Sequence, residues 1–162
     1  MTRRSRFAKP ALFAGAALAL AALASAWWLA SGVGSRPGDP DDARQVALGK
    51  KVYADYCASC HGAHLEGQPD WRLRKPDGRL PAPPHDFHGH TWRHPDDDLF
   101  GMVKEGMAAY APPGYQTDMK GYAEVLSDAQ IWAVIAFIKS NWPPEFRTYQ
   151  QKITAGARGR DQ

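Results

Sequence analysis

Two cysteines and a histidine stand together in the segment Cys57-Ala58-Ser59-Cys60-His61. Two thiols three positions apart can each form a thioether bond to a vinyl group on one edge of a porphyrin. A histidine directly after the second thiol is then held under the iron, where it can bind as an axial ligand. The spacing therefore predicts one c-type haem attached covalently through Cys57 and Cys60, with His61 as an iron ligand.

Two other kinds of site use closely spaced thiols. A thioredoxin-like dithiol places its first cysteine at a helix N-terminus in a βαβ unit, where the helix dipole lowers the thiol pKa. Here Cys57 follows a predicted helix, and the sequence has no alternating strand pattern. A zinc site usually takes four ligands from two paired motifs, and the sequence has no second cysteine pair. Both alternatives are therefore weaker than haem attachment.

Hydrophobic periodicity and capping signals predict three helices around this motif. Apolar residues recur at helical spacing over residues 42–56. A proline and three aspartates in the first turn begin a short helix over residues 95–106. The last strong helix begins at Ser127, which forms a capping-box pattern with Gln130, and ends before Pro143.

The segments between these helices are long for a small helical domain. Residues 62–94 and 108–125 have no sustained period and are rich in proline and glycine. Three short helices alone would enclose a poor core, whereas a large apolar cofactor would fill the space between them. We therefore expect an all-α fold of three or four short helices and long loops wrapped round one covalently bound haem.

Over roughly residues 43–142 the sequence resembles the class I c-type cytochromes. In that family a glycine and an aromatic residue of the N-terminal helix pack across the C-terminal helix, and Gly49 and Tyr53 occupy the matching positions. Val134 and Phe137 match the aliphatic and aromatic residues that face them. A glycine there allows two helix backbones to cross closely. The resemblance implies a cytochrome c-like fold.

The resemblance also implies the second iron ligand, which in this family is a methionine in the loop before the last helix. Met119 stands seven residues before Leu126, at the expected spacing, although Lys120 replaces the proline that often follows the methionine. A thioether is a soft, neutral ligand, so His/Met ligation favours a high reduction potential. The family also places a proline carbonyl beside the other ring nitrogen of the axial histidine. The candidates for it are Pro81, Pro83 and Pro84.

Other residues compete with Met119 for the iron. Met107 lies in the same loop and is a rival, whereas Met102 is expected to pack in the core. Four loop histidines could supply a second imidazole or bind copper or zinc separately; they are His85, His88, His90 and His94. We expect them instead to bond to backbone or water, with Trp92 packing at the haem edge. Four basic side chains of the first loop are expected to be solvated, with haem propionates or a partner as the alternative; they are Arg72, Arg74, Lys75 and Arg79.

The N-terminus has the pattern of an export signal. Four basic residues precede an uncharged run over residues 11–30, which as a helix would span roughly 30 Å, about the thickness of a bilayer core. Ala26 ends a possible cleavage site, while Trp27 and Trp28 suit a membrane interface. We expect retention as a single-pass anchor in the cytoplasmic membrane, with the haem domain on the periplasmic side. The alternative is a soluble periplasmic protein after cleavage near Ala26.

The predicted organisation of the 162 residues has four parts. They are a signal peptide or transmembrane anchor with linker at 1–35, a linker at 36–42, a cytochrome c domain at 43–142, and a partly disordered C-terminal extension at 143–162 with one or two helical turns. The four basic residues of the first part exceed the net charge of +3, so the rest of the chain has no positive excess. This charge distribution argues against a nucleic-acid partner.

The expected function is electron transfer by a single haem in a respiratory or periplasmic redox chain, without catalytic residues. The expected partners are a dehydrogenase, reductase or oxidase complex, of which the chain could itself be a subunit. Two alternatives stay open: a haem enzyme or gas or redox sensor with a replaceable sixth ligand, and a metal-binding assembly factor that uses the histidine-rich loop.

Overall fold

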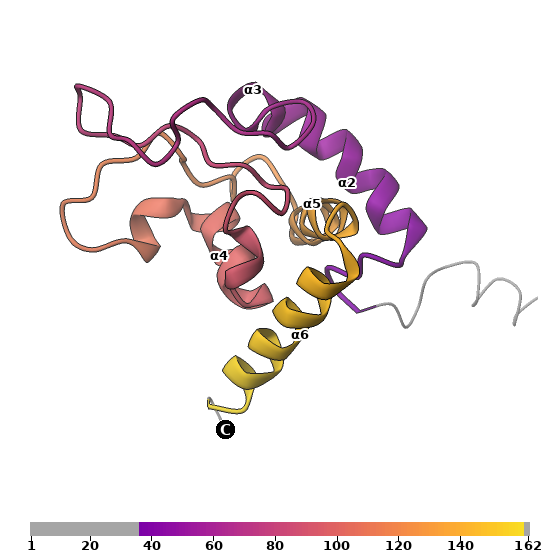
Figure 1. Cartoon of the computed structure of the whole chain (residues 1–162). Helices are drawn as coiled ribbons and strands as arrows, with labels where there is room; N and C mark the ends of the chain where they lie inside the picture. Colours follow the sequence, from indigo (N-terminus) through magenta and orange to yellow (C-terminus); the bar gives the residue numbers. More distant parts are fainter. Residues whose placement is uncertain (1–35, 161–162) are drawn as a thin grey trace, which may run out of the picture. The chain divides into compact units, whose positions relative to one another are not determined.

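The computed structural model describes residues 36–160, which form the helical body shown in Figure 1. Its α-helices are α2 (Ala43–Tyr56), α3 (Ala58–His61), α4 (Asp96–Glu105), α5 (Asp128–Ser140) and α6 (Pro144–Arg158), with short 3-10 segments η1 (Thr91–Arg93) and η2 (Met107–Tyr110). Apart from an isolated β-bridge, these residues form no strand. The predicted all-α fold is confirmed. The predicted signal or anchor lies outside the described residues, and within them no helix is long and apolar enough to cross a membrane.

Helices α2 and α5 form the centre of the fold, where α2 lies across α5 (Figure 1). A Cβ atom on Gly49 would fall on the backbone carbonyl of Ala133, so the two backbones approach more closely than any other residue at position 49 would allow. One turn later the Tyr53 ring packs on Phe137, with ring centroids 5.4 Å apart. The predicted helix crossing through these residues is confirmed, and it places the end of α2 beside the haem motif.

Helix α5 provides most of the buried apolar surface. Its N-terminus has the predicted capping box between Ser127 and Gln130. Ile131, Val134 and Ile135 are each at most 2% exposed. Burial of side chains of this size contributes about 1.5–3 kcal/mol each, so α5 is the core on which the other helices pack.

Helix α6 is longer than the sequence predicted. The expectation was one or two turns in a partly disordered extension, whereas the helix continues for 15 residues to Arg158. Its inner face buries Gln150 (0% exposed) and Thr154 (7% exposed) rather than an apolar stripe. The helix contains few large apolar residues and its buried face includes polar side chains, so its full extent was not predicted from the sequence.

The buried face of α6 meets Asp96 at the start of α4. The Oδ1 atom of Asp96 accepts hydrogen bonds from Lys139 Nζ at 2.7 Å and from Gln150 Nε2 at 2.8 Å. The Asp96 N–H donates to Thr154 Oγ1 at 3.1 Å. This cluster, which we call the Asp96 junction, joins α4, α5 and α6. The aspartates that open α4 therefore do more than compensate its dipole.

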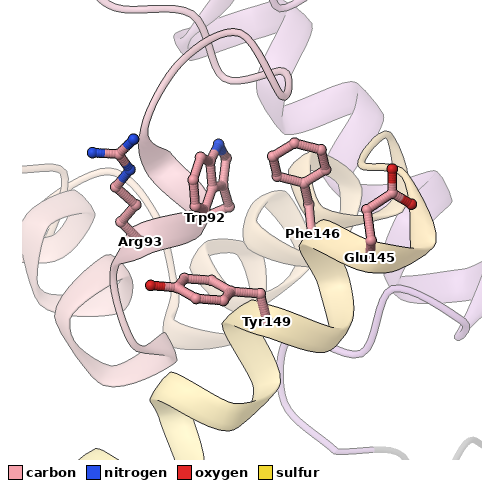
Figure 2. A pocket seen from close by; sticks show the side chains of 5 residues that line it. All are labelled: Trp92, Arg93, Glu145, Phe146 and Tyr149. Atoms are coloured by element: carbon pink, nitrogen blue, oxygen red, sulfur yellow. The ribbon is translucent and has the colours of Figure 1, made fainter.

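An aromatic contact also supports the same helix. Trp92 of η1 packs edge-on against Phe146 and Tyr149 of α6, with ring centroids 4.9 Å and 5.5 Å apart. Figure 2 shows these rings around a surface pocket, with Arg93 and Glu145 at its margins. The tryptophan expected at the haem edge thus packs against α6.

Candidate haem-binding site

Cys57 alone separates α2 from α3, and Cys60 lies within the single turn of α3. The Cys57 N–H still donates to Tyr53 O at 2.9 Å, which ends α2, and the single turn of α3 brings His61 N to Cys57 O, also at 2.9 Å. Cys57 is partly buried and Cys60 is exposed. Burial raises the pKa of the Cys57 thiol to about 12. A reactive redox dithiol needs a thiol with a lowered pKa, so the raised pKa of Cys57 argues against the thioredoxin-like alternative.

His61 is prepared as a neutral ligand by its surroundings. The side chain is buried, at 7% exposed, and its Nδ1 lies 2.9 Å from the Pro83 carbonyl. A carbonyl can only accept, so Nδ1 carries the proton and Nε2 presents its lone pair. Burial lowers the His61 pKa, and the hydrogen bond to Pro83 opposes this only in part. Among residues 36–160 no group hydrogen-bonds Nε2, so the donor set fits an iron-bound haem.

The structure thereby selects one proline from the three candidates. Pro83 is held in place by the loop pairing beside it, in which Gln68 N–H donates to Ala82 O at 2.9 Å and Ala82 N–H donates to Gln68 Oε1 at 3.1 Å. Gly67 has φ +70° and its N–H donates to His61 O at 2.7 Å. A Cβ atom on Gly67 would meet the Pro84 backbone. The close approach of the two loop segments therefore requires glycine and sets the position of the Pro83 carbonyl.

His85 lies against His61 rather than across from it. The two imidazole rings stack face to face, with centroids 3.8 Å apart and an interplanar angle of 17°. The axial ligands of one haem iron occupy opposite faces of the porphyrin and point at each other. A ring stacked on His61 does not lie across from it, so the geometry argues against His85 as the partner ligand of His61. Desolvation lowers the His85 pKa well below its ordinary value, which keeps the ring neutral.

Met107 and Met119, the two methionines considered as the sixth iron ligand, are adjacent. The Met107 N–H donates to Met119 O at 3.1 Å, beside the β-bridge between Gly106 and Lys120. Both side chains are partly buried. On the other side of Met119, its N–H donates to Thr117 Oγ1 at 3.1 Å. The structure thus brings Met119 and Met107 together. Met102 lies on α4 and is only partly buried, and it is not among the residues that form or pack against the core, so the expected core packing is not observed.

The basic residues of the first loop have partners that the sequence did not reveal. Asp118 accepts from Lys75 Nζ at 2.8 Å and lies 3.2 Å from Arg79 Nη1. The Lys75 ammonium lowers the Asp118 pKa through this hydrogen bond. Arg74 lies over the Tyr115 ring at 5.6 Å. The first loop is therefore fastened to the segment that contains Met119, and its charges are not merely solvated.

The remaining loop histidines do not form a metal centre. His88 is exposed and pairs with Asp86 at 3.1 Å. His90 stacks on Trp71, with centroids 5.5 Å apart, and lies beside His94. Across residues 36–160 no group of three or more His, Cys, Asp or Glu side chains is placed to hold a metal ion. The geometry thus gives no support to the metal-binding alternative in the part of the chain described.

Comparisons with known proteins agree with this site. The sequence profile of a family described as Cytochrome c matches residues 46–142. A curated relative, the thiosulfate dehydrogenase of Stutzerimonas stutzeri (strain A1501), is 28% identical over 136 residues. That alignment covers 75% of this chain and 39% of the relative, so the chain spans well under half of the relative's length. A search of solved structures gave no significant match.

Proposed function

The chain belongs to the cytochrome c family, and we propose on that premise that it is a monohaem electron carrier whose iron is bound by His61 and Met119. The family supplies a covalently bound haem c, and the one observation that best supports the carrier is the neutral, oriented His61 beside Pro83. Cys57 and Cys60 are the thiols that would hold the haem. The bound haem supplies one-electron exchange between ferric and ferrous iron.

The residues of this chain have three tasks in that function. The Pro83 carbonyl holds the proton on His61 Nδ1, which fixes the tautomer and makes the ring a better donor. The packed α2–α5 crossing keeps the two cysteines at a fixed position relative to the core. Buried loop side chains such as Leu65, which is 4% exposed, would limit the access of water to the bound haem and so favour the reduced, less charged iron. Two protein ligands that stay in place keep the geometry constant as the electron enters and leaves.

Met119 is favoured over Met107 because its segment is fixed on both sides. The hydrogen bond from Met107 N–H to Met119 O fixes both residues alike. The preceding Asp118 is also paired with Lys75 and Arg79, which fastens the Met119 segment to the first loop. The seven-residue spacing to Leu126 in the sequence also supports this choice. A loop fixed in this way can present a neutral thioether without a charge penalty.

Single substitutions test the ligand. In ferric holoprotein the Met119→Ala variant should lose the weak sulfur-to-iron absorption band in the near-red and should have a lower reduction potential. The Met107→Ala variant is the matched control, because it removes an adjacent methionine, and it should keep the band. The reverse result would assign Met107. Absence of the band already in the unsubstituted ferric holoprotein would leave a histidine or no sixth ligand and would favour the enzyme or sensor.

For the partners, we propose that the carrier exchanges electrons with a dehydrogenase, reductase or oxidase complex. The support is that the curated relative is named as a thiosulfate dehydrogenase, although this chain matches only 39% of it. Ferric holoprotein mixed with thiosulfate alone should stay oxidised. Adding a thiosulfate-oxidising enzyme should reduce it. Reduction by thiosulfate alone would instead make this chain an enzyme.

For the location, we propose that residues 11–30 stay as a membrane anchor and that the haem domain faces the periplasm. The support is the uncharged run itself, with basic residues on one side and Trp27 and Trp28 on the other. The intact mass of holoprotein extracted from membranes decides the question. A mature chain that begins at Trp27 would contradict the anchor and favour a soluble periplasmic carrier.

A further inference from the structure

We propose that His85 is a positioning residue that fixes the plane of the His61 imidazole and thereby the orientation of the axial ligand on the iron. The inference rests on the proposed function, because it requires His61 to bind the iron. Its basis is the face-to-face stack of the two rings, 3.8 Å apart at 17°.

The hydrogen bond to Pro83 does not by itself fix the ring plane. A carbonyl oxygen accepts hydrogen bonds over a broad range of directions, so His61 could tilt about its side-chain bonds and still keep Nδ1 near the Pro83 oxygen at 2.9 Å. A flat side chain against one face of the imidazole removes that freedom. The hydrogen bond therefore sets where the ring points, and the stack with His85 sets how it is turned.

His85 can act as a fixed surface because its own backbone is held on both sides. Its N–H donates to Leu65 O at 2.8 Å, and its carbonyl accepts from the indole N–H of Trp142, also at 2.8 Å. Trp142 is 2% exposed and belongs to the core beside α5. The ring also meets Tyr53 edge-on, with centroids 5.9 Å apart. The His85 ring is thus tied to the same core that positions the cysteines.

Leu65 gives a second, independent observation. It has φ +69°, a left-handed conformation that is uncommon for a residue with a branched side chain. Its carbonyl reaches both the His85 N–H and the Asp86 N–H, at 2.8 Å and 3.3 Å. Its side chain is only 4% exposed, in the core. Backbone strain of this kind persists where the surrounding structure requires it, and here it delivers the acceptor that holds His85 against His61.

The consequence concerns the electronic state of the iron. The plane of an axial imidazole determines which of the iron d orbitals overlap with its π system. The unpaired electron of ferric iron is then distributed unevenly over the porphyrin, and the haem methyl protons report that distribution as paramagnetic shifts. A fixed ring plane gives one pattern of shifts, and a mobile or turned ring gives a compressed or reordered pattern.

The test compares His85→Phe with His85→Leu in haem-loaded protein. Both side chains are apolar and fill most of the space, but only phenylalanine offers a flat face. We expect His85→Phe to keep the wild-type order of haem methyl resonances in the ferric protein, and His85→Leu to compress or reorder it. His88→Leu, at an exposed position in the same loop, should leave the pattern unchanged.

The same pattern of shifts in the phenylalanine and leucine variants would overturn the proposal, whether both match the wild type or both differ from it. A merely structural or polar role of His85 would not distinguish a flat from a branched side chain.

A second measurement needs no substitution and so does not depend on how well the variants fold. Wild-type holoprotein must show a nuclear Overhauser contact between the His61 and His85 rings, and its absence also overturns the proposal. Failure of the proposed function can be distinguished from failure of this proposal, because the wild-type holoprotein would then lack a low-spin ferric spectrum.

Discussion

The ion pair between Lys139 and Asp96 should be the most costly single polar contact to break in this domain. Both side chains are nearly inaccessible, at 5% and 12% exposed, and the charged atoms lie 2.7 Å apart. Replacing Lys139 by methionine would keep most of the volume but would leave the Asp96 carboxylate without its cation. Removal of one partner of a buried ion pair typically costs about 3–5 kcal/mol.

Two features of the structure place the expected loss of stability at the lower end of that range. In Lys139→Met the carboxylate keeps the hydrogen bond from Gln150 Nε2 at 2.8 Å. It also lies in the first turn of α4, where the helix dipole favours a negative charge by about 0.3–1 kcal/mol. We therefore expect a loss of about 3 kcal/mol in the free energy of unfolding. A second substitution, Asp96→Asn, removes the stranded charge and should restore part of that loss.

The matched control is Lys104→Met. Lys104 pairs with Asp128 at 2.8 Å, almost the same distance, but these side chains are 36% and 63% exposed. Exposed pairs contribute about 0–1 kcal/mol, so this variant should lose no more than that. Guanidinium unfolding of each holoprotein, followed by helical circular dichroism, gives both values. Equal losses in the two lysine variants would refute the conclusion that the Asp96 junction fastens α4 and α6 to the core.

Two further substitutions have equally direct outcomes. Gly49→Ala would force a methyl group onto a backbone carbonyl of α5 and should lower the free energy of unfolding by about 1–3 kcal/mol or more. Gly156→Ala, in open space on α6, should instead raise it by about 0.5–1 kcal/mol. Equal effects in thermal or denaturant unfolding would contradict the close helix crossing. Asp118→Asn should speed the replacement of Met119 by added imidazole, measured by loss of the near-red band, while Asp128→Asn should not. Because the pKa of Asp118 is lowered in the folded protein, its contribution is present above the unfolded pKa and is lost as the pH falls through the folded value. Acid also protonates free imidazole, so the rate is expressed per neutral imidazole. On that basis acidification should reproduce the effect of Asp118→Asn, and a rate independent of both would contradict the prediction.

The parts of this molecule that sequence analysis predicted are those determined by nearby residues. The haem motif needs only five consecutive positions, and the start of α5 needs only Ser127 and Gln130. The crossing of α2 and α5 was predicted from the resemblance to a family, and Gly49 shows its physical reason. Fold class and the haem attachment site could therefore be stated before any coordinates.

The parts that sequence analysis missed depend on residues far apart in the chain. Gln150 of α6 meets a carboxylate 54 positions away, and Lys75 meets Asp118 across 43 positions. One signal was available: Lys139 directly follows the apolar run 131–138 of α5, and a charge in such a place needs a buried partner. The stack of His85 on His61 had no such signal, because it depends on the path of the loop between them.

The connections on the two sides of Met119 differ in kind. The chain after it pairs with the end of α4, since the amides of Met107 and Tyr122 donate to Met119 O and Val103 O at 3.1 Å and 3.0 Å. The chain before it, residues 111–118, reaches the first loop through exposed ion pairs and a cation–π contact. Hydrogen exchange should therefore be slow at the amides of Met107 and Tyr122 and fast at the amides of residues 111–118. Local opening of 111–118 would therefore leave Met119 held by the paired chain after it, so the ligand stays within reach of the iron while the helices stay folded.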